Sequence, residues 1–386
     1  MLDILKERIL VLDGAMGTSI LALNLSQEED FRGHENCSEI LNESRPDVIE
    51  GIHNSFLEVG ADCLETNTLG ANKIVLREFG IEEQTYALNK DAAVIARRCA
   101  DAFSTPQRPR FVLGSIGPGT KLPSLGDTTF DILEDSYTEQ ARGLLDGGID
   151  AFIIETCQDL LQAKTAVCGV TRAMEEKSRR VPVIALVTIE LTGTMLVGSE
   201  IGAALVTLEA YPQVQVIGLN CATGPQEMSE HVRHLGRHCT RYIGVVPNAG
   251  LPQVVDGEPH YPLTPAELAK WLKEFAVTDG VNMVGGCCGT TPEHIAAVVE
   301  AVGGRNPVSR RTQSQPSVAS LYQPVALRQD QSFLIVGERS NTNGCRKFKG
   351  LLVEDDIDGL VGIGREQVNQ GAHVLDLCVD YVGRDG

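Results

Sequence analysis

Two adjacent cysteines, Cys287 and Cys288, follow an apolar, strand-like run in the string VNMVGGCCGT. Neighbouring side chains of a regular strand point to opposite faces, so both sulfurs can serve one site only if the backbone turns sharply at the strand end. Glycines on both sides of the pair permit that turn. A third cysteine, Cys221, ends another apolar run in VIGLNCATG. Three thiols at strand ends are the ligand set of a zinc ion with an open fourth position, so the pattern predicts a zinc site.

Two other interpretations of these three cysteines remain open. Buried cysteines are common core residues, and a vicinal pair can form a redox-active disulfide. The other eight of the eleven cysteines share no spacing, and we expect most of them to be core residues rather than ligands. They include Cys63, Cys99, Cys157, Cys168 and Cys239, whereas the pattern does not decide the role of Cys37.

A zinc ion bound by three thiolates has one net negative charge, which makes it a weak Lewis acid but a good holder of a soft ligand. A free thiol has a pKa of about 8.5, and coordination to zinc deprotonates it. The site therefore predicts alkyl transfer to a thiol substrate. A zinc hydrolase would usually need histidine and carboxylate ligands, and none of the eight histidines lies at a predicted strand end. A purely structural zinc would need four protein ligands and a closed site.

Eight apolar runs without polar alternation are typical of strands that are covered on both faces. They begin near residues 11, 62, 111, 151, 181, 216, 243 and 281. Helical patterns lie between them, such as LTPAELAKWLKEF, where Thr264 and Glu267 can form a capping box. Eight strand–helix units predict an α/β fold of the (β/α)₈ TIM-barrel type, usually about 250 residues long. The active site of such a barrel lies at the carboxyl ends of the strands, where the three cysteines fall.

The predicted barrel occupies residues 1–302. Residues 303–331 are rich in Ser, Gln, Pro and Arg and predict an interdomain linker. Residues 332–386 contain two more buried-strand patterns, FLIVGERSN and HVLDLCVD, and LVEDDIDGLVGIGREQVNQG between them has a helical pattern. This segment is too short to close a second barrel of the usual size, so we expect it to be the incomplete start of a second α/β domain.

Polar residues stand at other predicted strand ends. An ammonium group could bind to any of three carboxylates, those of Asp13, Glu65 and Glu155. The alternative for each is a role as a helix cap or in a structural ion pair, and this alternative is favoured for Glu65. The backbone amides of Gly17 and Thr18, at the start of the first helix, could bind a carboxylate. We therefore expect Asp13, Glu155, Gly17 and Thr18 to bind an amino acid.

The composition narrows the range of partners. A formal net charge of −19 opposes nonspecific binding to nucleic acid or to anionic membranes, so a small-molecule partner is favoured. Charged residues interrupt the apolar N-terminal segment, and no run reaches membrane length, so we expect neither a signal peptide nor a membrane span. An odd number of scattered cysteines favours reduced thiols and a cytoplasmic protein.

The strings LDGAMGT, LETNT, IIETCQD, GLNC, PNAG and GGCCGT occur in this order. With them, nearly all of residues 1–300 resembles the zinc-dependent homocysteine S-methyltransferase family. The later string FLIVGERSNTNGCRKFKGLL resembles the start of the pterin-binding domain of the cobalamin-dependent methionine synthase family. The chain is thus similar to the N-terminal part of those enzymes.

The resemblance implies a methyltransferase in which the three cysteines bind Zn²⁺ and Asp13 and Glu155 contact the amino group of homocysteine. It also implies that Asn248, which could otherwise cap a loop, occupies the open zinc position before the substrate arrives. In the second domain, Glu338, Asn341 and Asp376 match positions that line a methyltetrahydrofolate pocket, although Cys378 stands where the family more often has asparagine.

The reaction implied by the resemblance forms methionine from homocysteine. Methylcobalamin donates the methyl group and is recharged by 5-methyltetrahydrofolate, and a cobalamin-binding module outside this sequence is the expected partner. The alternative is a related methyltransferase that uses betaine, S-methylmethionine or another onium donor directly. The pterin-like continuation argues against that alternative.

Overall fold

The structure is a computed structural model that describes residues 1–255 and 258–384. Its internal contacts divide the chain into two units, Met1–Ser314 and Gln315–Gly386.

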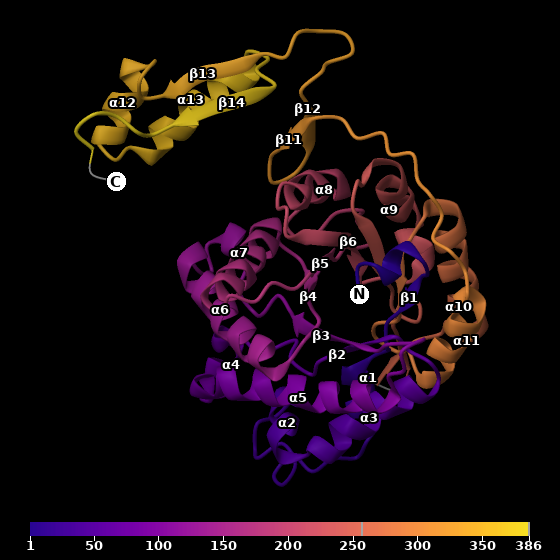
Figure 1. The fold of residues 1–386 in the computed structure, drawn as a ribbon. Helices are drawn as coiled ribbons and strands as arrows, with labels where there is room; N and C mark the ends of the chain where they lie inside the picture. Colours follow the sequence, from indigo (N-terminus) through magenta and orange to yellow (C-terminus); the bar gives the residue numbers. More distant parts are fainter. Residues whose placement is uncertain (256–257, 385–386) are drawn as a thin grey trace. The chain divides into compact units, whose positions relative to one another are not determined.

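The first unit is built around one parallel sheet, which in the described residues contains eight strands (Figure 1). Along the sheet the strands are β1 (Leu10–Val11), β10 (Met283–Val284), β7 (Tyr242–Val246), β6 (Val214–Asn220), β5 (Val183–Val187), β4 (Ala151–Cys157), β3 (Phe111–Ile116) and β2 (Cys63–Glu65). A parallel bridge between Leu12 and Cys63 joins the two ends, so the sheet closes on itself. The predicted (β/α)₈ barrel is confirmed, and each of the eight predicted runs overlaps one of its strands.

Helices follow the strands and surround the barrel (Figure 1). They are α1 (Met16–Leu21), α2 (Leu41–Ser44), α3 (Pro46–Glu58), α4 (Lys73–Glu78), α5 (Thr85–Phe103), α6 (Phe130–Gly147), α7 (Leu160–Glu176), α8 (Ile201–Glu209), α9 (Pro225–His238), α10 (Pro265–Glu274) and α11 (Pro292–Val302). The predicted capping box begins α10: Thr264 accepts a hydrogen bond from the Glu267 amide, and Glu267 accepts one from the Thr264 amide. Among the described residues, no helix is both long and apolar enough to cross a bilayer.

Burial on both faces explains why the barrel strands lack polar alternation. In β3 all six residues are buried, and in β5 all five are. Alternate residues such as Leu113, Ile153 and Leu186 belong to one buried cluster that contains side chains from many strands. Burial of such side chains contributes roughly 1.5–3 kcal/mol each, so the barrel is a rigid base for residues at its rim.

The second unit contains one antiparallel pair, β11 (Ser317–Ala319) with β12 (Pro324–Ala326), and one parallel pair, β13 (Val336–Asn341) with β14 (Val374–Cys378). The region between β13 and β14 holds two helices, α12 (Arg346–Val353) and α13 (Ile357–Asn369). The helical prediction for residues 352–371 was therefore wrong at 354–356, where the chain leaves the helix. Asp355 adopts a left-handed φ of 56°, and Asp356 then caps α13 by accepting the Gly359 amide at 2.9 Å.

The segment predicted as a linker, 303–331, is partly ordered by contacts. Arg310 donates to the carbonyl of Cys239 at 2.7 Å, and the amide of Gln313 donates to the carbonyl of Arg237 at 2.7 Å, so this part packs on the first unit. The β11–β12 pair occupies part of the remainder. The domain limits themselves stay a prediction.

Candidate metal and substrate site

The sulfurs of Cys221, Cys287 and Cys288 converge at the carboxyl ends of β6 and β10, within 4.8 Å of one another. All three cysteines are free, and the two sulfurs of the vicinal pair lie 4.0 Å apart. The pair is therefore not a disulfide in this structure. The three side chains are partly exposed, so a ligand can reach them.

The carboxyl end of β7 and the residue after it hold Cys221 near the vicinal pair. The amide of Cys221 donates to the carbonyl of Val246 at 3.1 Å, and the amide of Cys287 donates to the carbonyl of Pro247 at 2.8 Å. Because β7 lies between β6 and β10, one short segment fixes the backbone on both sides of the sulfur cluster.

A sharp turn after the vicinal pair lets both sulfurs face the same site. Gly289 has φ of 78°, and a Cβ there would stand 2.2 Å from Cγ of Tyr261. The ring of Tyr261 thus lies directly against this glycine, and its hydroxyl forms a hydrogen bond with Cys288. Only glycine fits this position.

The sulfur cluster is electrostatically asymmetric. Hydrogen bonds from Cys221 and Cys287 lower the pKa of Cys288 to about 3, whereas hydrogen bonding to the other two thiols raises the pKa of Cys287 well above its usual value. The protein alone therefore favours one thiolate shared among three sulfurs. A divalent cation would offset the repulsion among additional thiolates, which is why such clusters suit soft metal ions.

Two carboxylates lie at the ends of β1 and β2. Asp13 is buried, and its carboxylate accepts the Glu65 amide at 3.1 and 3.3 Å. Burial raises the pKa of both side chains, and the charge of Glu155 raises that of Glu65 further. Glu65 also shares a side-chain hydrogen bond with Glu155, so the three acids form one group.

Glu155, at the end of β4, is buried and held on both oxygens. One oxygen accepts the Ser115 hydroxyl at 2.6 Å, and the other accepts the Asn220 amide at 3.2 Å. Burial raises the pKa of Glu155 to about 7, and the negative charge of Cys288 contributes in the same direction. A substrate ammonium group would restore the ionised form of this carboxyl group.

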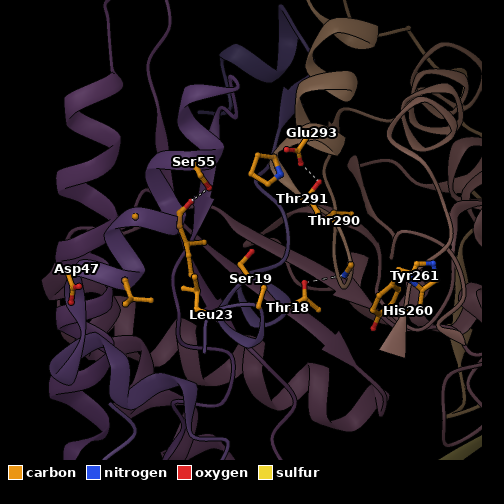
Figure 2. Close-up of a pocket in the computed structure, with 16 residues that line it drawn as sticks. Thr18, Ser19, Leu23, Asp47, Ser55, His260, Tyr261, Thr290, Thr291 and Glu293 are labelled. Atoms are coloured by element: carbon orange, nitrogen blue, oxygen red, sulfur yellow. Dashed lines mark hydrogen bonds between the residues drawn. The ribbon is translucent and has the colours of Figure 1, made fainter. Parts of the chain in front are cut away.

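Gly17 and Thr18 lie in the first turn of α1, beside the cysteine loop. The Thr18 hydroxyl accepts the Gly289 amide at 3.4 Å, which joins α1 to the turn after the cysteine pair. Thr18 and Tyr261 both line a pocket of about 870 Å³ (Figure 2). The pocket adjoins the sulfur cluster through Gly289 and extends toward α3.

Asn248 is buried between two residues that contact the cysteine loop. The Ala249 amide donates to the carbonyl of Cys288 at 2.9 Å, and Pro247 accepts the Cys287 amide. The Asn248 Oδ1 atom is buried and has no hydrogen-bond partner among the described residues. An orphaned acceptor at this place is available to a cation or a substrate donor.

In the second unit, the predicted folate-binding residues lie on two paired strands, Glu338 and Asn341 on β13 and Asp376 on β14. The Asn341 amide donates to the Asp376 carboxylate at 2.8 Å. Glu338 lies three residues before Asn341 on β13, and the side chains of Glu338 and Asp376 are exposed.

The sequence did not single out Ser115, Asn220 or Tyr261. Two of them hold Glu155, and Tyr261 contacts Cys288. Asn220 carries a local signal, because it stands directly before Cys221 in GLNC. Ser115 and Tyr261 have none, since their contacts join residues 40 and 27 positions apart in the chain.

Comparison with known proteins places the chain among methyltransferases. A family model described as homocysteine S-methyltransferase matches residues 10–302. The chain belongs to the homocysteine S-methyltransferase family.

Two curated relatives match over the whole chain. The methionine synthase of Mycobacterium tuberculosis is 52% identical over 386 residues, and that of Mycobacterium leprae is 51% identical over 391 residues. Each match covers 100% of this chain and 32% of the relative, so the chain spans about a third of their length.

Solved structures support the fold. The metallated form of the homocysteine methyltransferase MmuM from Escherichia coli has a TM-score of 0.62 and 24% identity, covering 77% of this chain and 96% of that chain. Its oxidized form has a TM-score of 0.61 and the same identity, covering 78% and 97%.

Proposed function

We propose that this chain transfers a methyl group to the thiol of homocysteine, forming methionine, and that Cys221, Cys287 and Cys288 hold a Zn²⁺ ion for this reaction. The observation that supports the proposal most directly is the convergence of three free sulfurs within 4.8 Å at the carboxyl ends of two barrel strands. Family membership supplies the substrate class.

The donor set fits zinc. Three sulfurs and the orphaned Oδ1 of Asn248 provide four donors of types that zinc accepts, and an amide oxygen is the weakest of the four. Asn248 is therefore the ligand that we expect the substrate thiol to replace. A zinc ion bound here supplies one chemical effect, which is to keep a coordinated thiol deprotonated at neutral pH.

The acidic group orients the substrate. Asp13 and Glu155 bind the ammonium group of homocysteine, since both are buried carboxyls that lack a cationic partner in the described residues. The amides of Gly17 and Thr18 bind the substrate carboxylate. Fixing both ends of the amino acid directs its short thiol side chain toward the sulfur cluster.

The methyl donor that we propose is methylcobalamin, recharged by 5-methyltetrahydrofolate. Relatives that share 52% and 51% identity are named methionine synthase and are about three times as long, which supports further modules that carry cobalamin and complete the folate site. Glu338, Asn341 and Asp376 would then line part of the pterin pocket. A cytoplasmic location agrees with eleven free cysteines, since a reducing compartment preserves them.

The test is a donor comparison with the zinc-loaded chain. Homocysteine is supplied with free methylcobalamin, betaine or S-methylmethionine, and methionine formation is measured for each. Methionine from methylcobalamin alone supports the proposal, whereas methionine from an onium donor alone would replace the cobalamin assignment. X-ray absorption at the zinc edge provides the second measurement: an unchanged ligand shell after addition of homocysteine would contradict thiol binding to the metal.

A further inference from the structure

We infer that Asn220 is a positioning residue that sets the orientation of Glu155 for the ammonium group of the substrate. The inference rests on the proposed function, because it assumes that an amino thiol binds beside the sulfur cluster. It assigns a task to a side chain that contacts neither sulfur nor substrate in the proposal above.

Asn220 is the last residue of β6, and its side chain reaches past β5 to the end of β4. It is fully buried. Its Oδ1 accepts the Thr156 amide at 2.7 Å, and its Nδ2 donates to the Thr156 hydroxyl at 2.9 Å and to the Glu155 carboxylate at 3.2 Å. One acceptor and two donor hydrogens are thus all used, so the amide can hold only one orientation.

The backbone that carries Glu155 is irregular and depends on these bonds. Thr156 has a left-handed φ of 58°, and the register of β4 with β5 shifts between Ile154 and Cys157. The irregularity takes the Thr156 amide out of the regular strand ladder, and Asn220 accepts it instead. Without the Asn220 Oδ1 atom, the amide of Thr156 would have no hydrogen-bond acceptor. The local turn that orients Glu155 would then be less stable.

The sulfur cluster does not depend on the same side chain. Cys221 follows Asn220, but its amide is held by the Val246 carbonyl at 3.1 Å. The carbonyl of Asn220 is held separately by the Thr188 hydroxyl at 2.9 Å. Both bonds use backbone atoms of Asn220 and Cys221, so a change of the Asn220 side chain leaves them in place. Loss of the amide should therefore affect ammonium binding and spare metal binding.

The experiment uses the full chain and two ligands that differ only in the group that Glu155 contacts. Homocysteine and 4-mercaptobutyrate share the thiol and the carboxylate, but the second lacks the amino group. In Asn220→Asp the donor to Glu155 becomes a negatively charged acceptor. We expect its dissociation constant for homocysteine, measured by calorimetry, to rise by about tenfold or more, because a buried hydrogen bond to a charged group is lost. Affinity for 4-mercaptobutyrate and zinc content should match wild type.

Asn24→Asp is the matched control, since it makes the same chemical change at an exposed residue. A double variant adds a readout that a general folding defect cannot produce. In a chain that already carries Glu155→Gln, the side-chain amide at position 155 can donate a hydrogen bond to the carboxylate that N220D introduces. Adding N220D to Glu155→Gln should therefore weaken homocysteine binding little or not at all compared with Glu155→Gln alone. If N220D fails to fold, Asn220→Ser is tested with the same two ligands. We again expect weaker binding of homocysteine and unchanged binding of 4-mercaptobutyrate.

Three results overturn the inference. Unchanged homocysteine affinity in N220D shows that the amide does not orient Glu155. Equal losses for homocysteine and 4-mercaptobutyrate show general disruption of the site. Additive losses in the double variant show that Asn220 does not act through Glu155. The proposed function itself is overturned if the wild-type chain binds zinc but does not bind homocysteine. This result is obtained with the wild type, before any variant is made, so it is not confused with failure of the inference about Asn220.

Discussion

Cys287 and Cys288 are consecutive residues whose sulfurs lie 4.0 Å apart, face the same site and form no disulfide with each other. Adjacent side chains normally diverge, so this arrangement depends on the turn at Gly289 and on the Cys287–Pro247 hydrogen bond. The geometry has a chemical meaning because two sulfurs at this separation can both contact one ion of the size of zinc, with bonds of about 2.3 Å.

Cys288→Ala should abolish zinc binding while the barrel still folds. The substitution removes one of three sulfur donors at the rim, whereas the stability of the fold resides in the buried strands. Zinc content after dialysis, measured by atomic absorption, should fall from about one per chain to near zero, with an unchanged far-UV circular dichroism spectrum. Cys168→Ala, on α7, is the control and should keep its zinc. Full zinc content in Cys288→Ala would exclude the cysteine assignment.

Glu155→Gln should weaken homocysteine binding and leave zinc content unchanged. The substitution keeps the shape of the side chain but removes the negative charge that a bound ammonium group would contact. We expect a loss of about 1.5–3 kcal/mol, roughly 10- to 100-fold in dissociation constant. Calorimetric titration measures it, with the exposed Glu58→Gln as control. Wild-type affinity in Glu155→Gln would remove this residue from the substrate site.

Gly289→Ala should damage both the turn and the metal site. A left-handed φ of 78° costs about 1–2 kcal/mol for a residue with a Cβ. The added carbon would also displace the ring of Tyr261, which lies 2.2 Å from that position. Chemical denaturation should show a lower free energy of unfolding, and zinc affinity should fall with it.

Gly51→Ala provides the contrast for that experiment. Gly51 lies in α3, and a Cβ there would meet no described atom within 4 Å other than those of its chain neighbours and its own helix backbone. Alanine in a helix stabilises by about 0.5–1 kcal/mol relative to glycine, so this variant should be as stable as wild type or more so. Equal destabilisation of both variants would show that steric contact with Tyr261 is not the cause.

His53 should make the stability of the barrel pH-dependent in mildly acidic solution. The side chain is fully buried, neither ring nitrogen has a hydrogen-bond partner within residues 1–255 and 258–384, and burial lowers its pKa to about 4. Between pH 6.5 and 4 the unfolded chain binds a proton that the folded chain does not, so stability is lost as the pH falls through this window.

The contribution of His53 is of order 3 kcal/mol across that window. His53→Leu removes the titrating group. The free energy of unfolding of this variant minus that of wild type should therefore increase as the pH is lowered from 7 to 4. Denaturant titrations at several pH values measure it. A difference that stays constant with pH would show that His53 does not remain neutral in the folded barrel.

The sequence predicted the parts of the molecule that depend on local pattern. Strands buried on both faces leave continuous apolar runs, and the structure brings the sulfurs of Cys221 and the vicinal pair together at the carboxyl ends of such strands. The contacts of Ser115 and Asn220 with Glu155 could not be predicted, because they depend on how neighbouring strands are staggered and on the irregular end of β4. The break at Asp355 was missed although it carries a local signal, because aspartate is a poor helix former and is favoured at the N-cap position that Asp356 occupies.

The order of strands gives the cysteine cluster a further role. The vicinal pair follows β10, which comes last in the sequence among the strands of the barrel sheet and pairs with both β7 and β1. The sheet is complete only with β10 in place between these two strands, and the closed sheet brings together the sulfurs of Cys221, Cys287 and Cys288. A metal ion bound by these sulfurs would link the end of β6 to the segment after β10 and would stabilise the closed sheet. Metal binding during biosynthesis would therefore show that the barrel has closed.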